Sequence, residues 1–128
     1  MDVVEERFRP RDVDTDSQEE MKAMQTEIAG AAVFTDAIDF TPDSIREGEA
    51  LVAGVDQAFP EDRAVSAVVV LRGAEVVARA SAVTQQSMPY VPGLLAFREG
   101  PPVISALESL EVDPDLVVFD GSGRIHYR

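Results

Sequence analysis

The sequence contains no cysteine, one histidine and one lysine among its 128 residues. The absence of cysteine excludes disulfides, zinc-thiolate sites and thiol catalysis, and the single His126 excludes a site built from several histidines. No apolar run approaches the ~18 residues that a membrane-spanning helix needs. The first residues are acidic and lack the apolar core of a signal peptide. We therefore expect a cytoplasmic protein without a membrane partner.

Carboxylates dominate the charge. The 24 Asp and Glu residues outnumber the 11 Lys and Arg residues, and the formal net charge is −13. This balance argues against broad electrostatic attraction to nucleic acid. Two interpretations remain open. The chain is either a halophilic protein, whose carboxylates keep its surface hydrated in high salt, or an ordinary acidic protein.

The length allows one domain with a modest core, and a hydrophobic content of 45% is typical of a globular protein. Residues 1–16 are polar and acidic, which predicts a flexible leader. Residues 17–50 predict an N-terminal helix and a linker, and residues 51–128 predict the main α/β domain.

The N-terminal helix is predicted from its cap and its apolar spacing. Ser17, or the acid before it, can cap the helix, and the spacing continues to about Ala32. One face of this helix would carry the apolar residues Met21, Met24, Ile28 and Ala32. The following stretch, residues 34–49, contains the turn residues Thr41-Pro42-Asp43 and predicts a linker.

The main domain begins with a β pattern. Apolar runs over residues 51–59, 65–71 and 75–83 are separated by short turns, at 60–63 and 72–74. Strands joined by such short turns are antiparallel neighbours. The pattern therefore predicts a three-stranded antiparallel meander.

A helix and a last strand are predicted to follow. The helix comes after the Pro92-Gly93 turn and ends at Asp113-Pro114. Pro101 and Pro102 either kink it or start a new helical segment. Residues 115–120 predict a buried strand, which runs parallel to an earlier strand because a helical crossover precedes it. The predicted order is β-β-β-α-β, a mixed sheet.

Three acids stand beside apolar runs on three separate elements. Asp56 lies on the first strand, Glu99 in the helix and Asp120 at the end of the last strand. Carboxylates that converge repel each other unless a cation lies between them, and Mg²⁺ or Mn²⁺ takes oxygen ligands. The alternative is that the two Asp residues are ordinary strand-end acids and that Glu99 is an exposed helix residue.

The element order and these acids resemble the ribonuclease H-like nuclease fold. Three segments within it resemble the endonuclease V family: Ala53-Gly54-Val55-Asp56, residues 89–99 and residues 120–126. The second segment is long and specific, and the order and spacing of the other two agree with it. The resemblance covers residues 21–128, which correspond to the N-terminal part of the family's domain.

The resemblance implies a DNA-repair nuclease that depends on Mg²⁺ or Mn²⁺. Its partner would be nucleic acid containing deaminated adenine (hypoxanthine), and it would hydrolyse a phosphodiester bond 3′ to that base in DNA or RNA. By the same resemblance, Asp56, Glu99 and Asp120 match metal-binding and catalytic acids, and His126 matches a catalytic histidine. Tyr90 matches an aromatic wedge. The other residues that match substrate-binding positions are Pro92, Gly93, Leu95 and Gly121.

An alternative function remains open because the resemblance covers only part of the family's domain. The chain would then be a non-catalytic remnant or a fragment of such a nuclease, which binds metal or nucleic acid weakly. An unpaired sheet edge would also allow the chain to associate with itself.

Overall fold

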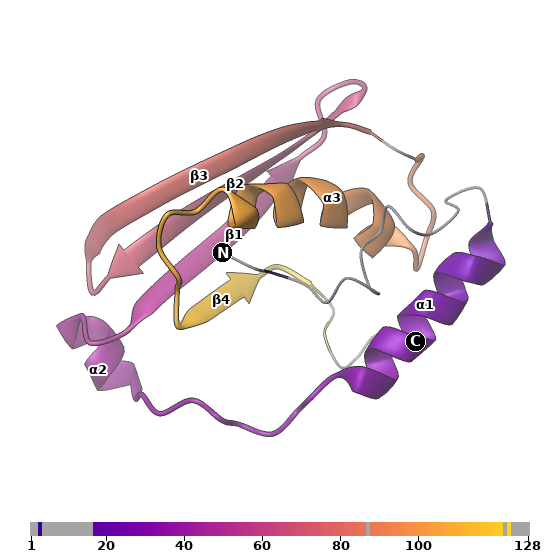
Figure 1. Ribbon diagram of the computed structural model, residues 1–128. Coiled ribbons are helices and arrows are strands. Elements are labelled where there is room, and N and C mark those ends of the chain that lie inside the picture. The colour runs from indigo at the N-terminus through magenta and orange to yellow at the C-terminus, as the bar shows by residue number, and fades with distance from the viewer. Residues whose placement is uncertain (1–2, 4–16, 87, 122, 124–128) are drawn as a thin grey trace.

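The computed structural model describes Val3 and residues 17–86, 88–121 and 123. Within these ranges, three helices and four strands follow one another (Figure 1). Their bounds are α1 Gln18–Ala31, α2 Pro42–Glu47, β1 Leu51–Ala58, β2 Arg63–Arg72, β3 Glu75–Gln85, α3 Leu95–Glu108 and β4 Leu116–Phe119. No helix in this described part is long and apolar enough to cross a membrane.

The strands form one mixed sheet in the order β3-β2-β1-β4. β2 pairs antiparallel with both β1 and β3, while β4 pairs parallel with β1. The register places Val55 of β1 opposite Phe119 of β4, so the next residues, Asp56 and Asp120, lie at the same end of neighbouring strands. The predicted order and the mixed α/β fold are confirmed.

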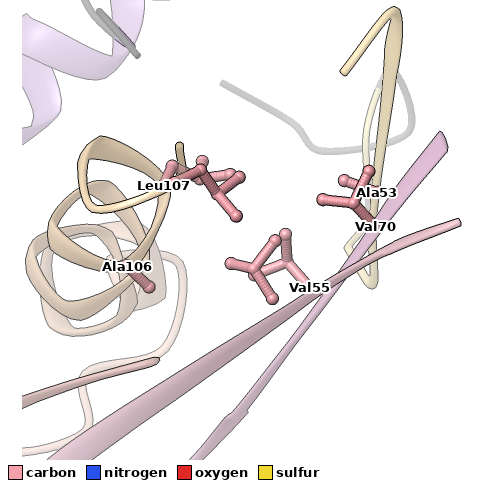
Figure 2. Packing of buried hydrophobic residues seen from close by; sticks show 7 residues of the cluster. Ala53, Val55, Val70, Ala106 and Leu107 are labelled. Carbon is pink, nitrogen blue, oxygen red and sulfur yellow. The ribbon is translucent and has the colours of Figure 1, made fainter. Parts of the chain in front are cut away.

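The helix α3 covers one face of the sheet. Figure 2 shows Ala106 and Leu107 of α3 lying opposite Ala53, Val55 and Val70 of the strands. Residues alternate between the two faces of a strand, so the buried residues of β1 and β2 point towards α3 and their neighbours point away from it. The core therefore lies on the α3 side of the sheet.

The N-terminal helix α1 forms as predicted, but its apolar face is only partly used. Ser17 is the N-cap, and its side chain accepts a hydrogen bond from the backbone of Glu20. Met21 is buried and Met24 is half-buried, whereas Ile28 and Ala32 are exposed. Only the first half of the predicted apolar face therefore reaches a packing partner.

The predicted linker contains a short helix, α2. The side chain of Thr41 accepts from the backbone N–H of Ser44, and the Ser44 hydroxyl accepts from the backbone of Thr41. Pro42 stands at the start, where a missing N–H costs nothing, and Gly48 ends the helix in the left-handed region. The turn chemistry at residues 41–43 was therefore the start of a helix.

The helix α3 runs as a single helix with Pro101 and Pro102 inside it. Of the two predicted alternatives, a new helical segment beginning at the prolines is therefore excluded. The helix also ends at Glu108, earlier than the predicted stop at Asp113-Pro114. Pro102 is buried against the rest of the structure, so packing offsets the backbone hydrogen bonds that the two prolines cannot donate.

Candidate functional site

A cleft of about 810 Å³ lies where the ends of β1 and β4 meet the first half of α3. Its lining residues come from α1, β1, the loop before α3, α3 itself and the end of β4. They are Gln25, Asp56, Gln57, Gly93, Leu95, Ala96, Glu99, Gly100, Val103, Phe119, Asp120, Gly121 and Gly123. Elements far apart in the sequence therefore contribute to one concave surface.

Asp56 is held in place by its own strand and by the neighbouring strand. One carboxylate oxygen, Oδ1, accepts from the backbone N–H of Gln57 at 2.9 Å. The hydroxyl of Ser66 on β2 donates to the backbone oxygen of Asp56 at 3.4 Å. Ser66 is fully buried, and this bond gives its hydroxyl a partner in an otherwise apolar layer. The exposed side chain of Asp56 thus extends from a fixed backbone.

Glu99 lies on the first half of α3 beside a restrained arginine. The guanidinium of Arg98 lies over the Phe59 ring, 4.3 Å from its centroid. With the side-chain amide of Gln86 oriented so that its oxygen faces Arg98, this oxygen accepts from the Nε of Arg98 at 2.8 Å. Burial raises the pKa of the Glu99 carboxyl, the charge of Arg98 opposes this rise and the charge of Asp120 adds to it. Glu99 and Asp120 therefore interact through the cleft.

The chemistry of these carboxylates fits a hard divalent ion, although the three side chains are not grouped around one point. Mg²⁺ needs only one or two carboxylates, because it keeps several waters and takes oxygens from its substrate. Within the described ranges, no three His, Cys, Asp or Glu side chains are grouped closely enough to hold one ion together. Like charges oppose a closer approach of the three acids unless a cation lies between them.

The loop before α3 is shaped by a tight turn. The backbone N–H of Leu94 donates to the carbonyl of Val91 at 3.0 Å, and Gly93 has a φ of 80°. Pro92 and Gly93 thus occupy the two central positions that a type II turn prefers. The buried side chains of Met88 and Leu94 anchor both sides of this loop, whereas the ring of Tyr90 between them is 59% exposed.

The helix α1 is attached directly to this loop. The side-chain Nε2 of Gln25 donates to the carbonyl of Gly93 at 2.7 Å, across 68 positions of sequence. Met21, which is 1% exposed, packs with Met88, Leu94 and Phe97 on the same side. Sequence reasoning missed Gln25 as a cleft residue. A single polar residue on a helix gives no signal in the sequence that its side chain bonds to Gly93, 68 positions away.

Most of the residues singled out from the sequence gather at the cleft. Six of the nine line it: Asp56, Gly93, Leu95, Glu99, Asp120 and Gly121. Tyr90 and Pro92 are exposed on the neighbouring loop and do not line it. His126 lies outside the described residues. Of the other lining residues, Gln57 and Phe119 directly adjoin the strand acids.

Comparisons with a family model and with curated relatives point to the same family. A family model for endonuclease V matches residues 20–128. The endonuclease V of Natronomonas pharaonis is 61% identical over 128 residues, which are 100% of this chain and 51% of that protein.

Solved structures agree with the sequence comparison. The endonuclease V of Streptomyces avermitilis has a TM-score of 0.75 and 44% identity, covering 87% of this chain and 48% of its own. The Ciona intestinalis endonuclease V was solved with a 24mer DNA containing an inosine followed by a ribo-adenosine. It has a TM-score of 0.72 and 27% identity, and the match covers 85% of this chain and 48% of that one. The chain spans about half the length of the curated relatives it matches.

Proposed function

The chain belongs to the endonuclease V family, and on this premise we propose that its cleft is part of a nuclease site for nucleic acid containing deaminated adenine. The reaction would be the metal-dependent hydrolysis of a phosphodiester bond 3′ to that base. The observation that supports this proposal is the lining of the cleft, which combines Asp56, Glu99 and Asp120 with the glycine-containing loops at residues 93 and 121.

The carboxylates would face the scissile phosphate. Asp56, Glu99 and Asp120 would supply oxygen ligands to Mg²⁺ or Mn²⁺, which when bound neutralises phosphate charge and lowers the pKa of an attacking water. Without a cation these acids repel a phosphate, and the net charge of −13 adds to that repulsion. A bound cation would offset this repulsion at the phosphate, and we therefore expect cutting to depend on divalent ions.

The loops would face the extruded base. Deamination replaces the amine donor of adenine with a carbonyl acceptor, so backbone N–H donors can distinguish the two bases. A Cβ added at Gly121 would meet nothing within 4 Å, which leaves its backbone open to close approach. The exposed ring of Tyr90 between two prolines would stack where the base leaves the duplex.

The test is cutting of an end-labelled oligonucleotide with one inosine, against the same strand with adenine. The 128-residue chain is assayed alone and joined to the remaining half of the Natronomonas relative. We expect poor or no cutting by the chain alone, and inosine-dependent cutting with Mg²⁺ or Mn²⁺ by the joined protein. Inosine-independent cutting, or none, by the joined protein would contradict the proposal.

Two variants of the joined protein separate the roles of acid and ring. Asp120→Ala should abolish cutting and leave binding of the inosine strand largely intact. Asp113→Ala changes an exposed acid outside the cleft and should leave both cutting and binding unchanged. Tyr90→Ala should weaken binding by about 1–3 kcal/mol if one stacking contact is lost.

A second candidate function is binding without cutting. It needs only the glycine-containing loops that line the cleft, whether or not the acids beside them hold an ion. In that case the joined protein would retain inosine-dependent binding in the presence of EDTA, and adding Mg²⁺ or Mn²⁺ would produce no cleavage.

A further inference from the structure

The helix α1 contacts the loop before α3 in two chemically different ways. Met21 is 1% exposed and packs with Met88 and Leu94, which is an apolar contact. One turn further along α1, the half-buried side chain of Gln25 reaches the same loop, and its Nε2 donates to the carbonyl oxygen of Gly93 at 2.7 Å. The apolar contact already attaches the helix to the loop. The polar contact adds a direction, because a hydrogen bond restricts where its acceptor points.

The peptide unit between Gly93 and Leu94 is held at both of its polar ends. Gln25 holds its carbonyl oxygen, and the carbonyl of Val91 accepts from its N–H at 3.0 Å. Because a peptide unit is planar, two such bonds fix the orientation of the whole group. Gly93 has a φ of 80°, and glycine gives up more conformational freedom on being fixed than any other residue. The orientation of this peptide therefore depends on the bonds made to it.

This peptide borders the cleft. Gln25, Gly93 and Leu95 all line the cleft, together with the acid Glu99. Leu95 is the first residue of α3, and the first N–H groups of a helix have no partner within that helix. These N–H groups are donors, whereas the Gly93 carbonyl is an acceptor. The hydrogen-bonding character of the loop towards the cleft therefore depends on how the carbonyl of Gly93 is turned.

The two bases respond oppositely to a backbone acceptor. Hypoxanthine carries a carbonyl oxygen where adenine carries an amine, so a carbonyl facing this group would repel hypoxanthine and accept a hydrogen bond from adenine. We propose that Gln25 is a positioning residue, which holds the Gly93 carbonyl away from the base and thereby sets the preference of the cleft for hypoxanthine. This inference rests on the proposed function and extends it to a residue of α1.

The first measurement uses the 128-residue chain and involves no substrate. Gln25→Met retains the length of the side chain but cannot donate to the loop. Amide hydrogen exchange at Leu94 should become about tenfold faster, because its bond to Val91 loses the second support of the same peptide. Exchange at Leu110, whose N–H donates to Leu107 at 3.0 Å just beyond the end of α3, should not change. Equal exchange at Leu94 in the parent and the variant would overturn the proposal.

The second measurement uses the 128-residue chain joined to the remaining half of the Natronomonas relative. It compares cutting of an inosine strand with cutting of the same strand containing adenine. Gln25→Met should raise KM for the inosine strand about tenfold and leave kcat within about twofold, because Gln25 acts on binding of the base and not on the phosphate. The ratio of kcat/KM for inosine to kcat/KM for adenine should fall about tenfold.

Two matched variants separate positioning from stability. Gln25→Lys restores a donor at the same place, and its added charge strengthens binding of both strands alike, so the ratio should return towards that of the parent. Thr26→Val removes a different side-chain bond of α1, from the Thr26 hydroxyl to the Lys22 carbonyl at 3.0 Å, and should leave the ratio unchanged. An equal fall in the ratio for Thr26→Val and Gln25→Met would overturn the proposal, because α1 would then act only through stability.

The two measurements also distinguish this inference from the proposed function. A joined parent that shows no preference for inosine contradicts the proposed function, while faster exchange at Leu94 in Gln25→Met still supports the positioning of the peptide. A joined parent that prefers inosine, with a ratio that Gln25→Met leaves unchanged, retains the proposed function and overturns the role of Gln25.

Discussion

The two faces of the β-sheet are built from the same strands but differ in what covers them. On the α3 side, Ala53 and Val55 are 0% and 7% exposed and pack against Leu107. On the other side, Gly54 is exposed between them, and its neighbour Val118 is 52% exposed. Apolar composition alone therefore does not identify the core. A face is buried only where another element reaches it.

The largest difference between the faces is expected from truncating a core side chain. Leu107→Ala should lower the free energy of unfolding by about 2–5 kcal/mol, because it leaves a cavity between α3 and the sheet. Val118→Ala on the open face should change it by less than about 1 kcal/mol. Urea denaturation of both variants measures the difference. Equal losses would show that Val118 is covered in solution.

The next comparison is between two glycines that differ in the room for an added side chain, Gly73 and Gly54. A Cβ at Gly73 would lie 2.8 Å from the carbonyl oxygen of Arg46, and Gly73 has a φ of +58°. Gly73→Ala should therefore destabilise the chain by about 1–2 kcal/mol or more. Gly54→Ala should stabilise it by about 0.5–1 kcal/mol, since alanine suits a strand better than glycine. Thermal melts check both signs, and a destabilised Gly54→Ala would mean that this space is filled.

A smaller effect is expected where the covered side meets the cleft. Gln25→Met retains the length of the side chain but removes its hydrogen bond to the Gly93 carbonyl. The free energy of unfolding should fall by about 0.5–1.5 kcal/mol. Gln18→Met, at the exposed start of α1, is the control. If both variants unfold at the same urea concentration, the bond does not hold α1 to the loop.

The smallest effect concerns the charge of Glu99, which is half-buried at the cleft. Burial raises the pKa of this carboxyl above its ordinary value of 4.5, despite the opposing charge of Arg98. The folded state thus binds the proton more tightly, and this contribution to stability is lost as the pH rises through the raised pKa. Glu99→Gln should therefore gain stability relative to the parent as the pH rises from about 4 to about 7.

The pH comparison is made in EDTA, so that no metal ion neutralises the carboxylate. Glu111→Gln, at an exposed position beyond α3, is the matched control. Parallel profiles for the parent and Glu99→Gln would contradict the role of burial.

Much of the fold could be predicted because its signals are local. The alternation and short turns of residues 51–85 identify three antiparallel strands, and Ser17 begins α1 where its hydroxyl can cap the backbone. The same local signals were misjudged at Thr41, where a capping box was interpreted as a turn. The spacing also predicted the apolar face of α1 but not which half of it is buried, because an apolar position is buried only if a partner lies beside it.

The sequence by itself determined most of the elements, the antiparallel meander of β1, β2 and β3, and the Pro92-Gly93 turn, because each depends on neighbouring residues and on the conformations they allow. Only the tertiary structure decided that Asp56 and Asp120 share an edge, that Gln25 bonds to Gly93 across 68 positions, and that one apolar face stays open. These contacts depend on which strand β4 joins and on where the chain crosses the sheet. No local spacing contains that information, because chain segments of the same composition can pack on either face.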